Sequence, residues 1–569
     1  MKIQNTPNLK LNSTTNDQLQ NGSLNSAAPA FKGGGDSFAM FLRFLDTNQA
    51  WGASAVDVTC MCTPRTLVDF TRGPDAGLET ARREFSSTID DALVGAYGVG
   101  AAWLLSQTFN NKFGVKAHKM FIGDEMVDIL SHTWNEKSKA KDPLKDFLNQ
   151  VVGTTKGFNP DHASADKKGW IGIDKASQAK VVDKLVEEIK NGPESMSKET
   201  KAYLKSILAT STGSERNFRI EKQIGNTKKE AITSLDDFIS DVYKLSKAFT
   251  NEKVTETFKN GDISSNAFIK GLKGTNRKAS IVGVGIATGI GLCLQPLNMY
   301  LTRKKTGKTG FVGVEGREPD DSKGFKILKY AIAGAAGLAV LKSIGKFSEI
   351  LSKIQFKGFT PTIAQYKFVY GFTVVSRLLS ARDKNELRES SIKDSLGYAS
   401  WLIIGGFVSK FTAMGIQKMA KFKNTGEKFI RYNAAQNGEG GFNKLIKSSL
   451  VTRDEALYES LKKAGISTIK DGKALNFKEM MKLAPQSAKT KIRYIGLIQM
   501  AGYLYSGLAL GVGIPKLNIA ITNSVEKKRK AEEAKHKHHN ENKPVKMPVD
   551  ESVKEELKPN SVLETADSK

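Results

Sequence analysis

The longest uncharged stretch of the chain, residues 279–301, limits the possible folds more than any other feature. It has the sequence ASIVGVGIATGIGLCLQPLNMYL and is followed almost at once by Arg303, Lys304 and Lys305. A helix of roughly 20 apolar residues is long enough to cross a hydrocarbon core of about 30 Å. The stretch is therefore predicted to be a membrane-spanning helix, with a buried soluble helix and a nucleotide-binding glycine loop as the alternatives.

Five further apolar segments accompany this stretch. Residues 494–515 are of similar length and uncharged, and residues 92–111 are long enough but rich in Gly and Ala. Segments 327–345, 366–380 and 396–416 contain Lys or Arg, so they also suit buried soluble helices. With no run of alternating strands, the predicted fold class is all-α: a multi-pass helical membrane protein with about two to six spans, helical soluble inserts and disordered termini.

The polar intervals between these segments also have helical patterns. Apolar residues recur at helical spacing over 177–207, with a break at NGPESMSKET, which predicts an αα-hairpin. A second stripe over 235–249 predicts a helix with one buried face. The resulting sections are a disordered leader (1–38), a charged helical pair with the first apolar helix (39–111), a soluble helical insert (112–275), an apolar membrane region (276–416), a second soluble helical insert (417–490), the last apolar helix (491–523) and a disordered charged tail (524–569).

Gly283, Gly285 and Gly289 spell part of a dinucleotide-binding loop, but their surroundings favour helix packing. Such a loop follows a strand and expects an acidic residue about 20 positions later, where this chain has a basic cluster. Gly285 and Gly289 are four residues apart, a spacing that lets apolar helices approach closely. We therefore predict that these two glycines pack against another helix and that the chain holds no cofactor.

Residues 62–85 carry the densest arrangement of charge in the chain. Arg65, Asp69 and Arg72 share one helical face, and Gly73-Pro74 then ends one helix and begins the next. Because guanidinium groups suit phosphate and carboxylate, a possible anion-binding site is predicted. Its members are Arg65, Asp69, Arg72, Glu79, Arg82 and Arg83. The alternative is a salt-bridged surface pair of helices, and no nucleophile is paired with a base for catalysis.

The net charge of +27 indicates anionic partners such as lipid headgroups or nucleic acid. The KKRK at 527–530 follows the last apolar segment, where it favours anionic lipid. No motif for specific nucleic-acid binding is present. The three cysteines, Cys60, Cys62 and Cys293, predict neither a disulfide framework nor a metal site. The predicted partners are the lipid bilayer, with anionic lipids, and proteins that contact the soluble inserts.

These features predict an integral membrane protein that acts in transport, in membrane organisation or in anchoring a complex. One alternative is a soluble basic all-α protein that binds nucleic acid or proteins, and another is a membrane-associated enzyme that uses residues 65–84 on an anionic substrate. With six spans, the basic loops 302–326 and 381–395 lie on one side. Both termini are then predicted in the cytoplasm, with both inserts on the opposite face; if 92–111 does not span, the first insert and the leader share a side.

Overall fold

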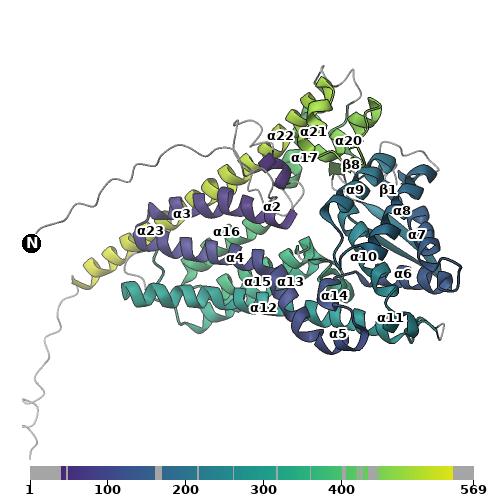
Figure 1. Ribbon diagram of the computed structural model, residues 1–569. Coiled ribbons are helices and arrows are strands. Elements are labelled where there is room, and N and C mark those ends of the chain that lie inside the picture. Colours follow the sequence, from purple (N-terminus) through teal and green to yellow (C-terminus); the bar gives the residue numbers. More distant parts are fainter. Residues whose placement is uncertain are drawn as a thin grey trace, which may run out of the picture.

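The computed structural model describes residues 40–45, 49–159, 169–214, 217–259, 262–314, 318–358, 360–399, 405–419, 422, 427–432, 445 and 448–541. Their structure is mostly helical and has two parts, an elongated helical bundle and a mixed unit at one end of it (Figure 1). The predicted leader, 1–38, lies outside the described residues.

The bundle consists of seven passes of the chain from one end to the other. Two passes contain short π-helical segments, labelled η1 and η7, that continue the α-helices on either side. The passes are α2 (Gln49–Val56), η1 (Asp57–Cys62) and α3 (Thr63–Phe70); α4 (Pro74–Leu105); α12 (Ala267–Thr306); α13 (Lys323–Ile344); α15 (Ile363–Leu379); α16 (Lys384–Ala399); and α22 (Gln486–Tyr505), η7 (Ser506–Gly513) and α23 (Ile514–Glu541).

The mixed unit contains helices and a small antiparallel sheet, with strand order β2-β1-β3-β4. The strands are β1 (Lys156–Phe158), β2 (Trp170–Gly172), β3 (Phe218–Ile224) and β4 (Thr227–Thr233). The helices are α5 (Gln107–Phe113), η2 (Ala117–Lys119), α6 (Asp124–Lys137), α7 (Pro143–Thr154), α8 (Lys175–Asn191), α9 (Lys198–Thr212), α10 (Leu235–Phe249), α11 (Glu252–Thr257), α20 (Arg453–Lys463) and α21 (Phe477–Leu483).

Short elements connect or extend these parts. They are η4 (Phe347–Glu349), α14 (Ile350–Lys353), α17 (Gly405–Gln417), and the two-residue strand pairs β5 (Ile430–Arg431) with β6 (Ser449–Leu450) and β7 (Ile469–Lys470) with β8 (Lys473–Ala474).

The predicted helices of the mixed unit are confirmed, and the section 112–275, predicted as a helical insert, also contains four strands among its described residues. The predicted αα-hairpin is α8 and α9, and the predicted stripe is α10, whose N-terminus is capped by the Ser234 hydroxyl. The sheet was not expected; its register pairs Phe218 with Thr233 and places Phe218 and Ile220 in the core. Aromatic side chains from α6, α7 and α10, namely Trp134, Phe147 and Phe249, pack in the same core.

The outer surface of the bundle is apolar over much of its length. Three of its helices are long and apolar enough to cross a bilayer: α12, α13 and the continuous α22–α23 helix. Large apolar side chains stand exposed along them, including Ile281, Ile286 and Leu297 on α12, Ile327 and Leu338 on α13, and Leu504, Leu508 and Leu517 on the last. Large exposed apolar surfaces of this kind mark sites of contact with a membrane or with another protein.

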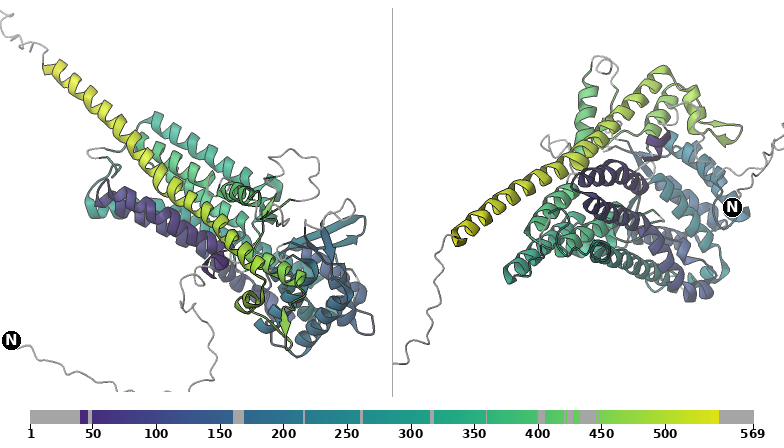
Figure 2. Two further views of the ribbon diagram at one scale, coloured as in Figure 1. Left: turned by 90° about the horizontal axis from the view of Figure 1, so that it is seen from above. Right: turned by 90° about the vertical axis from the view of Figure 1, so that its left-hand side faces the viewer.

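The two ends of the described chain lie at opposite ends of the bundle. Arg43 forms an ion pair with Asp454 of α20 at 2.8 Å, at the end that carries the mixed unit. The helix α23 leaves from the other end (Figure 2). The described chain therefore begins at the end with the mixed unit and finishes, after seven passes, at the other end. The cytoplasmic location of both termini stays a prediction. Residues 524–541, predicted as part of a disordered tail, are helical.

A buried ion-pair network in the bundle

Residues 62–85 form the end of η1, the helix α3 and the start of α4, as the Gly73-Pro74 break predicts. Gly73 has φ of 129°, a conformation that side chains rarely adopt, and Pro74 begins α4. The six residues of the predicted anion site do come together, but inside the bundle. Four of them are buried (Arg65, Asp69, Glu79 and Arg83) and Arg72 and Arg82 are half-buried.

Glu84 lies at the centre of the network, next to four basic side chains. Arg65 and Arg83 approach its carboxylate from the N-terminal helices at 3.5 and 3.4 Å. Arg377 of α15 and Lys393 of α16 approach at 3.3 and 3.4 Å. Only 5% of the Glu84 side chain is exposed, so little water screens these charges. Glu84 is therefore surrounded by positive charge.

Two further sets of ion pairs extend the network along α16. Arg382 bridges Glu79 of α4 at 2.6 Å and Glu386 at 2.9 Å. Arg72 binds Glu389 through both guanidinium nitrogens, at 2.8 and 2.9 Å, a bidentate geometry that fixes orientation as well as charge.

The other predicted site residues have separate partners. Asp69 accepts a hydrogen bond from the Thr80 hydroxyl at 2.6 Å, and its carboxylate lies 3.8 Å from Arg72. Arg82 donates to the Thr302 hydroxyl of α12 at 2.7 Å, away from Glu84.

The partners that α15 and α16 contribute were not predicted from the sequence. Residues 381–395 were interpreted as a loop, whereas most of them form α16, and Arg377 pairs with Asp394 at 2.8 Å with almost no exposure of either side chain. A signal was present: Arg382, Glu386, Glu389 and Lys393 recur at i, i+4, i+7 and i+11, on one helical face. A charged helical stripe of this kind can face inward when another helix supplies the opposite charges.

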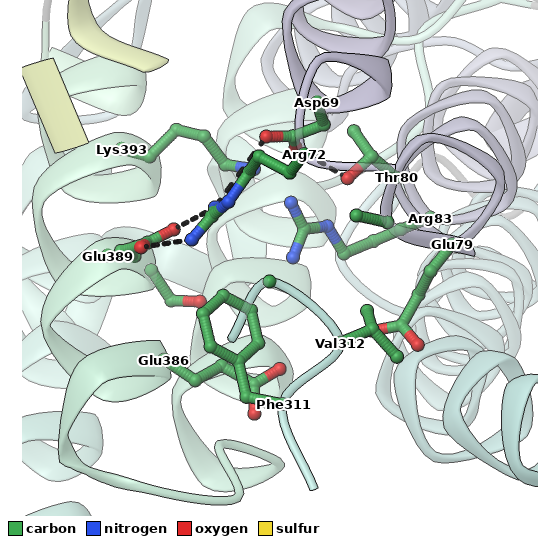
Figure 3. A pocket seen from close by; sticks show the side chains of 13 residues that line it. Asp69, Arg72, Glu79, Thr80, Arg83, Phe311, Val312, Glu386, Glu389 and Lys393 are labelled. Atoms are coloured by element: carbon green, nitrogen blue, oxygen red, sulfur yellow. Dashed lines mark hydrogen bonds and ion pairs between the residues drawn. The ribbon is translucent and has the colours of Figure 1, made fainter. Parts of the chain in front are cut away.

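The cavity beside this network is too small for a phosphate. It has a volume of about 20 Å³ and lies among Arg72, Arg83, Glu79 and Glu389 (Figure 3). A single water needs roughly 10–15 Å³ of such volume. The basic side chains are also neutralised by carboxylates of the same chain. The geometry thus favours a structural ion-pair network over an open anion site.

A second group of acidic residues, Asp57, Asp90 and Asp91, is buried in the bundle. Asp57 accepts a hydrogen bond from the Thr88 hydroxyl and lies 3.5 Å from the Cys62 sulfur. Asp90 and Asp91 follow on α4, both buried. Among the described residues, neither oxygen of Asp91 has a hydrogen-bond partner. Asp91 therefore differs from Glu84, whose carboxylate lies within 3.5 Å of four basic side chains.

The two π-helical segments face each other at the edge of the network. The Arg65 Nε donates to the carbonyl oxygen of Leu510 in η7 at 3.2 Å. Gly511 lies against the Cys60 carbonyl and Pro64, leaving no room for a side chain. A π-helical turn shifts the backbone hydrogen-bond pattern, so carbonyls there are available to other donors.

The predicted packing glycines, Gly285 and Gly289, face open space. A Cβ at either position would have no atom of another element within 4 Å. The close approach occurs on a different face of α12, where a Cβ at Gly283 would lie 2.6 Å from the Gly98 Cα of α4. Within this chain, the packing role belongs to Gly283 and Gly98; contact of Gly285 and Gly289 with another molecule stays a prediction.

The described residues contain no group of three or more His, Cys, Asp or Glu side chains that could hold a metal ion. Cys60, Cys62 and Cys293 are free thiols. A scan against protein-family models and searches of curated proteins and of solved structures found no match.

Proposed function

We propose that the chain is an integral membrane transport protein whose bundle crosses the bilayer and carries protons through buried carboxylates. The observation that carries this proposal is the polarity of the bundle, which is apolar outside and ionic inside. Soluble proteins have the opposite arrangement, with charge at the surface. In membranes, ionisable side chains that face a bundle interior commonly mark ion or proton pathways.

Asp91 supports transport rather than anchoring alone. A membrane anchor needs no ionisable group in its interior, and a buried carboxyl without a hydrogen-bond partner costs stability. The carboxyl groups of Asp57 and Asp90 oppose a negative charge on Asp91, and the guanidinium group of Arg377 favours it. A carboxyl in this position is suited to binding and releasing a proton as the environment on one side or the other changes.

A cluster of basic residues at one end of the bundle supports an orientation. The cluster lies at the C-terminal end of α12, at the end of the bundle where α23 also leaves, and consists of Arg303, Lys304, Lys305 and Lys308. The basic residues 527–530 lie on α23. Basic residues next to spans favour the cytoplasmic side and anionic headgroups. In this proposal the C-terminal end faces the cytoplasm and the mixed unit faces the opposite compartment.

Membrane integration is tested by one substitution on the exposed face of α12. Ile286 is 44% exposed, so Ile286→Arg disturbs no packing in a soluble bundle, but costs roughly 2.5–3.5 kcal/mol near the centre of a bilayer. We expect native protein to stay with membranes after an alkaline carbonate wash and the variant to be lost from them. Ile232→Arg, at a 50% exposed position of β4, is the matched control. Native protein that is monodisperse in water without detergent overturns the proposal.

Transport is tested separately in proteoliposomes that enclose a pH-sensitive dye. We expect a proton gradient to decay through native protein, and Asp91→Asn to abolish this flux without loss of protein from the membrane. Asp75→Asn, at the exposed pair with Lys308, is the control. Equal flux through native and Asp91→Asn protein excludes Asp91 as the carrier. Absence of flux in native protein favours a second candidate function, in which the bundle anchors the mixed unit to the membrane. The large core of the mixed unit suits this role.

A further inference from the structure

The mixed unit contains a cavity of about 500 Å³ that belongs to neither the ion-pair network nor the apolar surface. Its walls come from three places: the connection between α5 and α6, the turn between α8 and α9, and one face of α10. Small-molecule sites in proteins commonly have volumes of roughly 300–1,000 Å³. The cavity is therefore large enough for a ligand rather than for a few waters.

Positive charge dominates the lining. Five lysines contribute to it, Lys116, Lys119, Lys201, Lys244 and Lys247, against one lining carboxylate, Glu194. Lys116 and Lys119 share Glu194 at 2.9 and 3.3 Å, and all three side chains are about half exposed. A pair of this kind at a rim is weak and can open to a stronger anion.

Lys244 has a different environment from the other four lysines. Lys247 donates to the carbonyl oxygens of Gly192 and Pro193 at 2.7 Å, and Lys201 forms an ion pair with Asp236 at 3.4 Å. Among the described residues, no hydrogen bond or ion pair within 4 Å joins Lys244 to any partner. Burial lowers the pKa of Lys244; Asp241 and Asp237 partly offset this effect, and Lys201 adds to it. The ammonium group of Lys244 thus has acidic neighbours on its own helix but no direct anionic contact.

The rest of the lining is apolar and adaptable. Val115, Met120 and Met196 contribute aliphatic and thioether surface, and unbranched methionines adjust to ligands of different shape. No arginine lines the cavity, so no guanidinium group is available to bind a carboxylate through two parallel hydrogen bonds. Several lysine point charges instead suit a compact group of higher charge, such as a phosphate.

We propose that this cavity binds a small molecule that carries a phosphate group and an apolar portion, with Lys244 and the neighbouring Lys201 and Lys119 around the phosphate and the methionines beside the apolar portion. The phosphate belongs either to a soluble molecule or to a lipid headgroup. This proposal does not depend on proton transport, because the cavity and the acidic residues of the bundle are separate.

The test uses the full chain in a non-ionic detergent and phenyl phosphate as the probe, with phenol as the uncharged comparison. By titration calorimetry we expect native protein to bind phenyl phosphate but not phenol, and Lys244→Met to bind it at least about tenfold more weakly, since hydrogen bonds to charged groups contribute about 1.5–3 kcal/mol. Lys184→Gln, at a partly exposed position of α8 outside the cavity, should bind as native protein does.

A second variant and a second probe keep the outcomes distinct. If Lys244→Met does not fold, Lys119→Gln combined with Lys201→Gln should weaken binding instead. The source of the phosphate is identified by capture of the protein on vesicles that contain phosphatidic acid, compared with vesicles of phosphatidylcholine alone. If Lys244→Met abolishes this capture, the ligand is a lipid headgroup. If the variant is still captured, the ligand is a soluble molecule. Native protein that binds phenol as well as phenyl phosphate, or variants that bind phenyl phosphate as native protein does, overturn the proposal.

Discussion

Arg377 shows how strongly one side chain can depend on its charged neighbours. It is almost fully buried and contacts both Glu84 and Asp394. Removing one partner of a buried ion pair leaves the other charge uncompensated, which typically costs about 3–5 kcal/mol. We expect Arg377→Met to lower the free energy of unfolding by about that amount, measured by denaturation in detergent. Lys145→Met, which breaks an exposed pair with Asp183, should change it by only about 0–1 kcal/mol. Equal small effects would show that the network does not stabilise the bundle.

Two glycines on α12 provide a contrast between a crowded and an open position. A side chain at Gly283 meets the backbone of α4, whereas Gly289 has open space. Overpacking a tight contact costs about 1–3 kcal/mol. We expect Gly283→Leu to reduce thermal stability in detergent and Gly289→Leu to leave it unchanged. If Gly289→Leu instead weakens self-association of native protein, the glycines of the outer face contact a second molecule, as the sequence pattern suggested.

At the scale of elements, Asp128 of α6 joins the sheet to the first turns of α12. It accepts hydrogen bonds from Lys229 of β4 at 2.5 Å and from Lys273 of α12 at 2.7 Å. Burial alone would raise its pKa, but the two lysines outweigh that effect and hold the pKa of Asp128 below its usual range. Its contribution to stability is therefore complete above the unfolded pKa of about 3.9 and disappears as pH falls through the lowered value.

Comparison with Asp128→Asn isolates this contribution. We expect native protein to be more stable than the variant near neutral pH, and the difference to shrink as the solution is acidified below about pH 4. Thermal unfolding across that range measures it. A difference that stays constant with pH would show that Asp128 acts through shape rather than charge.

Some helices of this protein could be predicted from the sequence, and others could not. The helices α8, α9, α10 and α12 have long apolar patterns of a single period, and each was expected. The helix α16 was not predicted because its buried face is charged and the partners of those charges lie far away in the sequence. Glu389 of α16, for example, pairs with Arg72, which lies hundreds of residues earlier. The strands β1 and β2 have three residues each, too short for an alternating pattern to be distinguished.

The candidate site was predicted only in part, for a related reason. Spacing along 62–85 correctly indicated charged faces on two helices, but it contained no information about the surface those faces would meet. Burial of Arg65, Arg83 and Glu84 depends on packing against α15 and α16. Local patterns describe one helix at a time, whereas the environment of a charge is set by tertiary structure.

For the whole molecule, seven passes predict opposite sides for the mixed unit and the end of α23. Glu187→Cys, on exposed α8, and Lys535→Cys, near the end of α23, place one thiol at each end. In a background with the three native cysteines replaced, we expect a membrane-impermeant thiol reagent added to intact cells to label only the first. Labelling of both positions, or of Lys535→Cys alone, would contradict the arrangement or its orientation.

The continuous helix from Gln486 to Glu541 has a mechanical consequence. At 1.5 Å per residue it is about 80 Å long, nearly twice the roughly 40–45 Å of a bilayer with its headgroups. Its first turns are anchored in the mixed unit through Ile492, Ile495 and Ile498. A small tilt of that unit is therefore carried to the far tip as a larger sideways displacement. A partner bound at the tip would therefore be displaced further than the mixed unit itself.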